Sequence, residues 1–319
     1  MNFHLQFLIT PFPQKINYSH SSLFIGSCFA ENIAERMQQF KFNTLINPHG
    51  ILYNPSSIAN ALRRCKNNAP LEENELFFAN ECWNSWEHHS CFSDPDKQYC
   101  LNEINKAISV SHNAIQNAEW LFITFGSAFV YKRNGESVGN CHKQPQKEFE
   151  KHLLSTAEIV EEYKKLIEEL KQLNSKLKIV FTVSPVRYVR DGVVENTLSK
   201  ARLIDAVHQL TSERVFYFPA YELVMDDLRD YRFYKEDLVH PNEQAIDYVF
   251  EKFSAAAFDE ATIALSEKIK EIIQAKAHTA FNPGTETHKK FKATYVGRCL
   301  ELKKQYPYIQ LEEEIRFFS

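Results

Sequence analysis

The stretch "LFIGSCFAENIAERM", residues 23 to 37, contains a change from strand to helix. An apolar run ends at Gly26, and the residues from Phe29 onward have the apolar spacing of an amphipathic helix. Ser27 and Cys28 therefore stand side by side where the predicted helix begins. A hydroxyl or a thiol at such a corner is either a nucleophile or a small residue that packs and caps the first turn.

The same alternation of a short apolar run and a helical pattern continues along the chain. Strands that are apolar throughout, separated by amphipathic helices, predict a parallel sheet covered on both faces. In the helix expected from about 155 to 173, Ser155 or Thr156 can cap the first turn with Glu158 nearby, and one apolar face should pack on the sheet. Further helices are expected from about 197 to 212, from 241 onward and from about 287 to 305.

The chain of 319 residues is long enough for one large domain with an appendage. We expect an α/β domain over residues 1–258 and a helical C-terminal appendage over 259–319, where Lys and Glu become frequent. Between about 66 and 105 no period is sustained, and this segment is expected to be an irregular insertion that covers the mouth of the site.

Composition narrows the classes of function. The net charge of −4 gives no basic excess for nucleic acid, and no stretch approaches the roughly 20 apolar residues that span a bilayer. The seven cysteines form no CxxC pair and are expected to be reduced thiols, and the first residues do not have the pattern of a signal peptide. These features predict a cytoplasmic protein.

Four predicted strand ends carry residues that suit chemistry. They are Gly26-Ser27-Cys28, "INPHG" ending at Gly50, "TFGSA" with Gly126, and "DLVHPN" with Asp237 and His240. Ligands of an open parallel sheet collect at the carboxyl ends of its strands. A carboxylate three residues before a histidine can orient an imidazole that takes a proton from a nucleophile, so these ends are expected to meet at one cleft.

The strings "GSCFA", "INPHGILYNPSSI", "SPVR", "YFPAYE", "LRDYRFY" and "DLVHP" resemble the pattern of the GSCFA family, over roughly residues 5 to 255. That family is grouped with the SGNH, or GDSL-type, hydrolases. The resemblance implies a flavodoxin-like three-layer α/β/α sandwich, ester hydrolysis or acyl transfer, a nucleophile after the first strand, and an Asp-x-x-His motif near the end of the domain.

The resemblance also implies roles for individual residues. If Gly26 matches the glycine of the GDS pattern, Cys28 occupies the nucleophile position, with Ser27 as the alternative, and His240 and Asp237 complete the site. We expect the helix N-terminus and a nearby imidazole to lower the pKa of Cys28. Ser27 is then expected to cap the helix or to bond the loop after Gly50.

The oxyanion site implied by the resemblance is incomplete. Gly50 matches the second SGNH block, and a simple turn glycine is the alternative. The third block expects Gly-x-Asn, but the chain has Gly126-Ser127-Ala128. Loss of an oxyanion donor typically costs about 10² to 10³ in rate. Ser127 and Asn140 are the candidate replacements.

Other residues suggest substrate contacts. Trp83, Trp86 and His89 are expected to line the mouth of the site, with packing of the insertion as the alternative. Arg187 and Arg190 follow a predicted strand and suit an anionic group, although they are equally suited to be solvated loop residues or partners of the Asp230 region. The cysteines and histidines near 82–91 and 141–142 match no zinc spacing, so we predict neither a metal nor another cofactor.

We therefore predict an acyl-ester hydrolase with a Cys/Ser-His-Asp site and a small-molecule or carbohydrate ester as substrate. Two alternatives remain: an acyltransferase that uses a thioester donor, and a binding module that kept the sheet without efficient chemistry. The missing Asn of the third block favours the binding module, whereas a thiol nucleophile suits acyl transfer. The sequence specifies neither the acyl group nor an oligomeric state.

Overall fold

The centre of the protein is a five-stranded parallel sheet. The computed structural model describes residues 7–278 and 281–319. The strands run side by side in the order β2-β1-β5-β9-β10, and every neighbouring pair is parallel. This order is that of flavodoxin-like folds. The strands are β1 (Ser21–Gly26), β2 (Asn43–Ile46), β5 (Trp120–Phe125), β9 (Lys178–Val183) and β10 (Val215–Tyr217).

Helices cover both faces of the sheet and make it the middle of three layers. Alternate strand residues point to opposite faces, so Phe24 and Phe122 belong to one core cluster, whereas Leu23 and Ile25 belong to the other. The first cluster is closed by α1 (Cys28–Gln39) and α7 (Glu243–Ala257). The second is closed by α2 (Pro55–Asn67), α4 (Thr156–Leu173) and α5 (Val193–Leu210). The predicted α/β sandwich is confirmed.

Helix α4 forms as its sequence predicts. Ser155 accepts a hydrogen bond from the Glu158 amide, and the Glu158 side chain accepts one from the Ser155 amide, which is a complete capping box. Tyr163 and Leu170 are among the residues of its buried face, which packs on the sheet. Local capping and periodicity agree here with the tertiary structure.

The segment 66–105 is more regular than expected. It contains a hairpin of β3 (Leu76–Ala79) and β4 (Cys82–Ser85), and it includes the start of the 21-residue helix α3 (Lys97–Asn117). The prediction of irregularity was wrong. The apolar stripe of α3 is narrow and continues beyond residue 105, so residues 66–105 alone show no sustained helical period. Its first turns pack only on a small local core with Leu71 and Leu76.

A second, antiparallel sheet follows β5 and was not predicted. Its strands are β6 (Phe129–Arg133), β7 (Glu136–Val138) and β8 (Glu150–Leu153), in the order β7-β6-β8. Asn134 and Gly135 join β6 to β7, both with positive φ. An Asn-Gly pair between two runs is a strong hairpin signal, so the sequence did contain the information.

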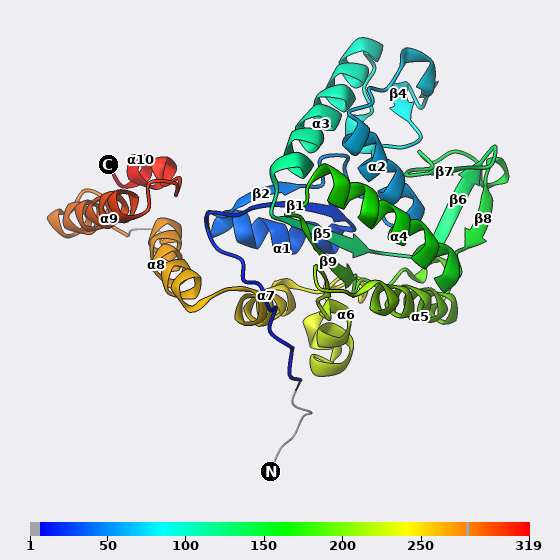
Figure 1. Ribbon diagram of the computed structural model, residues 1–319. Coiled ribbons are helices and arrows are strands. Elements are labelled where there is room, and N and C mark those ends of the chain that lie inside the picture. Colours follow the sequence, from blue (N-terminus) through cyan, green and yellow to red (C-terminus); the bar gives the residue numbers. More distant parts are fainter. Residues whose placement is uncertain (1–6, 279–280) are drawn as a thin grey trace.

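The C-terminal appendage consists of helices, as expected, and Figure 1 shows them gathered at one side of the sheet. Glu314 is buried and pairs with Lys41 at 2.8 Å and Lys276 at 3.0 Å, which ties the last helix to the turn after α1. The division of the chain at about residue 258 stays a prediction. The helices are α8 (Glu260–Ala277), α9 (Glu286–Gln305) and α10 (Glu312–Phe318).

The remaining elements are short. Helix α6 (Ala220–Glu222) continues into a π-helical turn, Leu223–Asp227. Turns of 3-10 helix are Glu73–Glu75, Ser90–Phe92, Gln146–Glu148, Val189–Asp191 and Tyr231–Phe233. Among the residues that the structure describes, no helix has both the length and the apolar character needed to cross a bilayer.

Candidate active site

The corner between β1 and α1 requires a glycine. Gly26 has φ of 137°, and a Cβ there would collide with the carbonyl oxygen of Thr124 on the neighbouring strand. The Gly26 amide donates to Asn47 Oδ1 at 2.8 Å, and the Ser27 amide donates to Thr124 O at 3.1 Å. Cys28 is the first residue of α1. The corner therefore holds the thiol at the carboxyl edge of the sheet.

Ser27 occupies the N-cap position of α1 without acting as a cap. Its backbone is extended, but its side chain makes no capping hydrogen bond. Ser27 is buried, and within residues 7–278 and 281–319 its Oγ has no hydrogen-bond partner. The expectation that this hydroxyl caps the helix or bonds the loop after Gly50 is therefore wrong. Cys28 is more exposed than Ser27, which favours the thiol as the accessible group.

Neighbouring groups shift the pKa of the Cys28 thiol in opposite directions. Burial raises its pKa, and the negative charge of Glu31, one turn further along α1, raises it too. The amides of Cys28 and Phe29 and the charge of Lys200 act in the opposite direction. The net direction is upward from the usual value of 9.0, so the expected lowering of the Cys28 pKa is not found.

The loop after β2 is folded by Asn47 and Gly50. Asn47 is buried, and its Nδ2 donates to Glu31 Oε1 at 3.1 Å. Gly50 has φ of 74°, and a Cβ there would collide with His89. The Gly50 amide donates to Asn47 O at 2.7 Å. In this structure the amide therefore belongs to the turn, and its role as an oxyanion donor stays a prediction.

The loop after β5 is also closed by its own hydrogen bonds. The amides of Gly126 and Ser127 both donate to Tyr53 O, at 2.7 and 3.0 Å. Gly126 leaves room for the Tyr53 ring, which would lie 3.1 Å from a Cβ at this position. Ser127 Oγ accepts from the Phe129 amide and bonds Ser199 Oγ. The backbone amides of Gly126 and Ser127 are thus both used within the loop, and the predicted binding roles of these residues stay predictions.

Asp237 and His240 lie in contact. His240 Nδ1 and Asp237 Oδ2 are 2.7 Å apart, and Asp237 Oδ1 accepts from the amides of Val239 and His240. These backbone donors are the main reason that the pKa of Asp237 falls to about 2. This contact occupies Nδ1 and so orients the imidazole ring, whereas Nε2 has no hydrogen bond in the described chain. His240 is 44% exposed, so solvent reaches the imidazole.

Arg187 holds the loop that carries this pair. Its amide donates to Val239 O at 3.3 Å, and its Nη1 donates to Leu238 O at 3.2 Å. Its guanidinium lies 4.4 Å from the centre of the Tyr234 ring. Because Arg187 follows β9, these bonds bring the loop to the carboxyl side of the sheet, where β1 also ends. No hydrogen bond joins Cys28 to His240 in the part of the chain that the structure describes.

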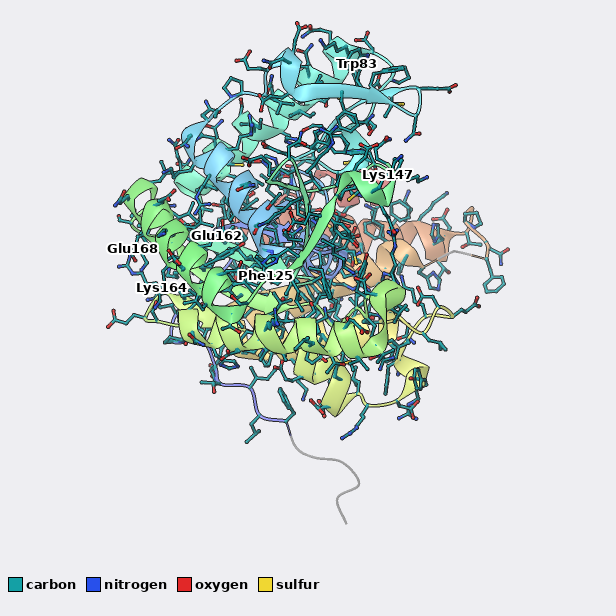
Figure 2. All side chains as sticks on the ribbon, turned by 90° about the vertical axis from the view of Figure 1, so that its right-hand side faces the viewer. Trp83, Phe125, Lys147, Glu162, Lys164 and Glu168 are labelled. Carbon is teal, nitrogen blue, oxygen red and sulfur yellow. The ribbon has the colours of Figure 1, made fainter. Side chains whose placement is uncertain are left out.

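The expected aromatic mouth is mostly a packed hairpin. Trp86 stacks on Phe77 with ring centres 3.7 Å apart, and Arg133 lies over Trp86 at 4.7 Å. Figure 2 shows Trp83 at the top of the lobe formed by the hairpin and α3, away from Phe125 at the end of β5. Packing thus accounts for both tryptophans, the alternative given for them above.

His89, predicted to line the mouth, and Asn140, predicted as a replacement oxyanion donor, differ in position. His89 contacts the loop after β2 at Gly50, and the charge of Glu31 acts on it. Asn140 is part of a turn, since its amide donates to Trp86 O and its Oδ1 accepts from the His142 amide. Of these two residues, His89 is the one that adjoins the loop after β2, which we call the site loop. Arg190 is exposed.

Behind the site loop lies a buried chain of side chains that the sequence did not reveal. Cys65 Sγ and His49 Nε2 are 2.7 Å apart, His49 Nδ1 and His88 Nε2 are 3.2 Å apart, and His88 Nδ1 and Ser85 Oγ are 2.9 Å apart. Burial lowers the pKa of His49 to about 4 and raises that of Cys65 to about 12, so both are neutral near pH 7. The insertion is therefore joined to the site loop through neutral polar groups.

Four residues that sequence reasoning missed also adjoin Cys28 or its loops: Glu31, Asn47, Tyr53 and Lys200. Tyr53 is partly exposed, and the charges of Cys28 and Glu31 help to raise its pKa. Glu31 and Lys200 lie on amphipathic helices, where a charge usually signals a solvated face. Asn47 had a signal, since Asn before Pro is typical of a tight turn.

Comparison with known proteins identifies relatives by sequence. Residues 21–253 match the GSCFA family, and residues 269–319 match the C-terminal domain of GSCFA proteins. No curated protein matches the chain. Among solved structures, a carbohydrate esterase family 3 protein from Talaromyces cellulolyticus is similar with a TM-score of 0.37 and 10% identity, over 79% of this chain and 99% of that one. With the family matched over most of its length, the chain belongs to the GSCFA family.

Proposed function

We propose that this chain is an acyl-ester hydrolase in which Cys28 is the nucleophile and His240, oriented by Asp237, transfers protons. The observation that carries the proposal is the Asp237–His240 contact of 2.7 Å. It leaves Nε2 of an accessible imidazole without a hydrogen bond in the described part of the chain, and the loop that carries it lies at the carboxyl edge of the sheet, where Cys28 begins α1. SGNH-type chemistry, which the motifs resemble, uses the same set of roles.

The reaction begins when His240 Nε2 takes the proton of the Cys28 thiol, directly or through one water molecule. The sulfur attacks the ester carbon, and the amides of the first turn of α1 stabilise the oxyanion. Collapse breaks the bond to the alcohol oxygen, which takes the proton from His240. Water then attacks the thioester while His240 accepts its proton. The carboxylic acid leaves, and the thiol is restored.

The high pKa of Cys28 has a consequence for this mechanism. A thiol that is protonated in the resting protein needs a base at the moment of attack, so turnover should depend strongly on His240. An O-acylated small molecule or carbohydrate is the substrate class that we propose. If an acceptor alcohol replaces water in the second step, the same site performs acyl transfer.

The experiment uses a panel of aryl acetates and acetylated oligosaccharides with the full chain. After rapid acid quenching, mass spectrometry should find one acyl group, on Cys28, and turnover should vanish in Cys28→Ala. Cys82→Ala, a thiol of the β4 hairpin, is the matched control and should keep full turnover.

The other outcomes separate the alternatives. Turnover that persists in Cys28→Ala but is lost in Ser27→Ala would assign the hydroxyl as nucleophile. Acyl-enzyme that releases product only when an acceptor alcohol is added would assign a transferase. Absence of acylation across the panel, with Cys28 no more reactive than Cys82, would favour a binding module.

A further inference from the structure

The loop that joins Asp237 to His240 holds a leucine in a backbone conformation that leucine disfavours. Leu238 has φ of 58°, in the left-handed region where a side chain with a Cβ is strained and glycine is not. Its side chain is nevertheless turned to solvent, since the residue is 53% exposed. In the described chain every other non-glycine residue with a positive φ is polar. A strained apolar residue thus stands two positions before the candidate base.

The hydrogen bonds of this turn account for its backbone but not for the leucine. The Leu238 amide donates to Lys235 O at 2.9 Å, and the Leu238 carbonyl accepts from Arg187 Nη1 at 3.2 Å. Both bonds use backbone atoms, so glycine or asparagine would form them with less strain. The turn itself therefore does not require an apolar side chain here, and strain that the fold does not require points to a function.

Exposed apolar side chains gather at the edge of the sheet that carries the candidate site. The four connections that enter β2, β5, β9 and β10 from a helix, all of them in the described chain, expose no large apolar residue. At the opposite edge, the segments that follow β2, β9 and β10 do expose such residues, namely Tyr53, Val189, Val193, Tyr231 and Leu238. The carboxyl edge is where an open parallel sheet binds ligands, so this contrast indicates a binding surface.

Arg187 holds two of these side chains together. Its Nη1 bonds the Leu238 carbonyl, and its guanidinium lies 5.2 Å from the centre of the Tyr231 ring. Tyr231 and Leu238 therefore form an apolar surface on the segment that carries His240. An apolar group gains free energy by leaving water for such a surface, whereas the hydroxyls of a sugar find no partner on a leucine.

The proposed chemistry decides which part of an ester would lie on this surface. When the ester bond breaks, His240 Nε2 gives its proton to the alcohol oxygen. The alcohol portion of the substrate must therefore lie against the loop that carries His240, and Leu238 belongs to that loop.

We propose that Leu238, together with Tyr231, binds an apolar group on the alcohol portion of the ester. The substrate is then an ester of an apolar alcohol, which selects the small molecule over the carbohydrate in the class proposed above. The assignment to the alcohol portion rests on the proposed function. The apolar binding surface rests on the strained backbone and on the exposure of these side chains.

The first test needs no turnover. The full chain is labelled with ¹³C in its leucine methyl groups, and NMR spectra are recorded as benzyl alcohol is added. Leu300 on α9 is the matched control, because it is also 53% exposed. The signals of each leucine are identified by their absence from Leu238→Asn or Leu300→Asn.

The Leu238 signals should shift and reach a plateau with benzyl alcohol, while the Leu300 signals stay in place. Glycerol, a polar alcohol, should move neither. Leu238 signals that stay unmoved up to the solubility limit of benzyl alcohol, or equal shifts at both leucines, would overturn the inference.

The second test measures selectivity between benzyl acetate and 2-methoxyethyl acetate, whose alcohols differ in apolar character. Leu238→Asn should lower the ratio of kcat/KM for benzyl acetate to that for 2-methoxyethyl acetate by about 10-fold, because the apolar contact is lost. Leu300→Asn should keep the ratio of the unaltered protein. Asparagine tolerates a positive φ, so the melting temperature of Leu238→Asn should not fall. A lower melting temperature with an unchanged ratio would assign the leucine to the fold and refute a binding role.

The two tests separate this inference from the function on which it rests. If no ester is hydrolysed but benzyl alcohol still shifts the Leu238 signals, the proposed function is refuted and the apolar binding surface stands. If Cys28 is acylated and esters are hydrolysed, but the ratio is unchanged in Leu238→Asn, the function stands and this inference is refuted.

Discussion

The protein contains two pairs of a cysteine and a histidine, Cys65 with His49 and Cys28 with His240, and they differ in burial and in hydrogen-bond partners. Cys65 and His49 lie 2.7 Å apart but are both 1% exposed. Cys28 and His240 share no hydrogen bond in the described chain, yet both are partly exposed, and His240 has the oriented carboxylate. Close contact between a thiol and an imidazole is therefore a poor sign of catalysis by itself.

The physical reason that close contact does not make the Cys65–His49 pair reactive is desolvation. Burial disfavours both the thiolate and the imidazolium, so the ion pair that a nucleophilic cysteine needs is suppressed in the Cys65–His49 pair. Cys28 and His240 are both partly exposed, so solvent reaches both side chains. The Cys65–His49 contact joins the insertion to the loop after β2, whereas Cys28 and His240 are the residues for which we propose catalytic roles.

The largest expected difference is in turnover. His240→Ala should lower kcat/KM for a hydrolysed ester by about 10² to 10⁴, because the proton acceptor is lost. His49→Gln should reduce it far less, because His49 is remote from solvent. Steady-state assays of both folded variants make the comparison. An equal loss in the two would mean that the buried chain takes part in proton transfer.

The next effect is the pH dependence of stability. The pKa of His49 is about 4 in the folded protein and 6.5 ordinarily, so the unfolded state binds more protons between these values. Its contribution to stability is complete above pH 6.5 and is lost as the pH falls to 4, by about 3 kcal/mol.

Urea unfolding from pH 4 to 7 measures this effect. His49→Gln should make the dependence shallower without abolishing it, because burial also lowers the pKa of the adjacent His88. The exposed His278→Gln should leave the dependence as it is. A slope in His49→Gln equal to that of the unaltered protein would assign the acid sensitivity to other groups.

A third comparison uses alkylation of the native protein. Although both thiols have raised pKa values, iodoacetamide should modify Cys28 at least about 10²-fold faster than Cys65, because Cys65 reacts only when the structure opens. In urea the two rates should converge. Peptide mapping with isotope-labelled reagent gives both rates in one sample, and equal native rates would contradict the burial of Cys65.

The smallest effect concerns two serines. Ser27 Oγ is buried without a partner in the described chain, so Ser27→Ala should change the free energy of unfolding by less than about 0.5 kcal/mol. Ser85→Ala should cost about 1–3 kcal/mol, because it leaves His88 Nδ1 unpaired. Chemical denaturation measures both. A loss above 1 kcal/mol in Ser27→Ala would mean that the hydroxyl does cap α1.

Much of the fold followed from local pattern. The alternation of apolar strands and amphipathic helices predicted the parallel sheet, and Ser155 with Glu158 predicted the start of α4. The Asp237–His240 contact could be predicted because the two residues are only three positions apart in one loop. Helix α3 and the small antiparallel sheet were missed, the first for its narrow apolar stripe and the second because Asn134-Gly135 was overlooked.

The sequence by itself determined the layers, the corner at Gly26 and the loop that pairs Asp237 with His240, because these depend on periodicity, on φ and on short chain separations. Only the tertiary structure decided that Ser27 is unpaired, that Glu31 and Lys200 act on Cys28 with opposite sign, and that Cys65, His49 and His88 form a buried chain. Burial and long-range charge depend on which distant segments meet, and no local spacing encodes that meeting.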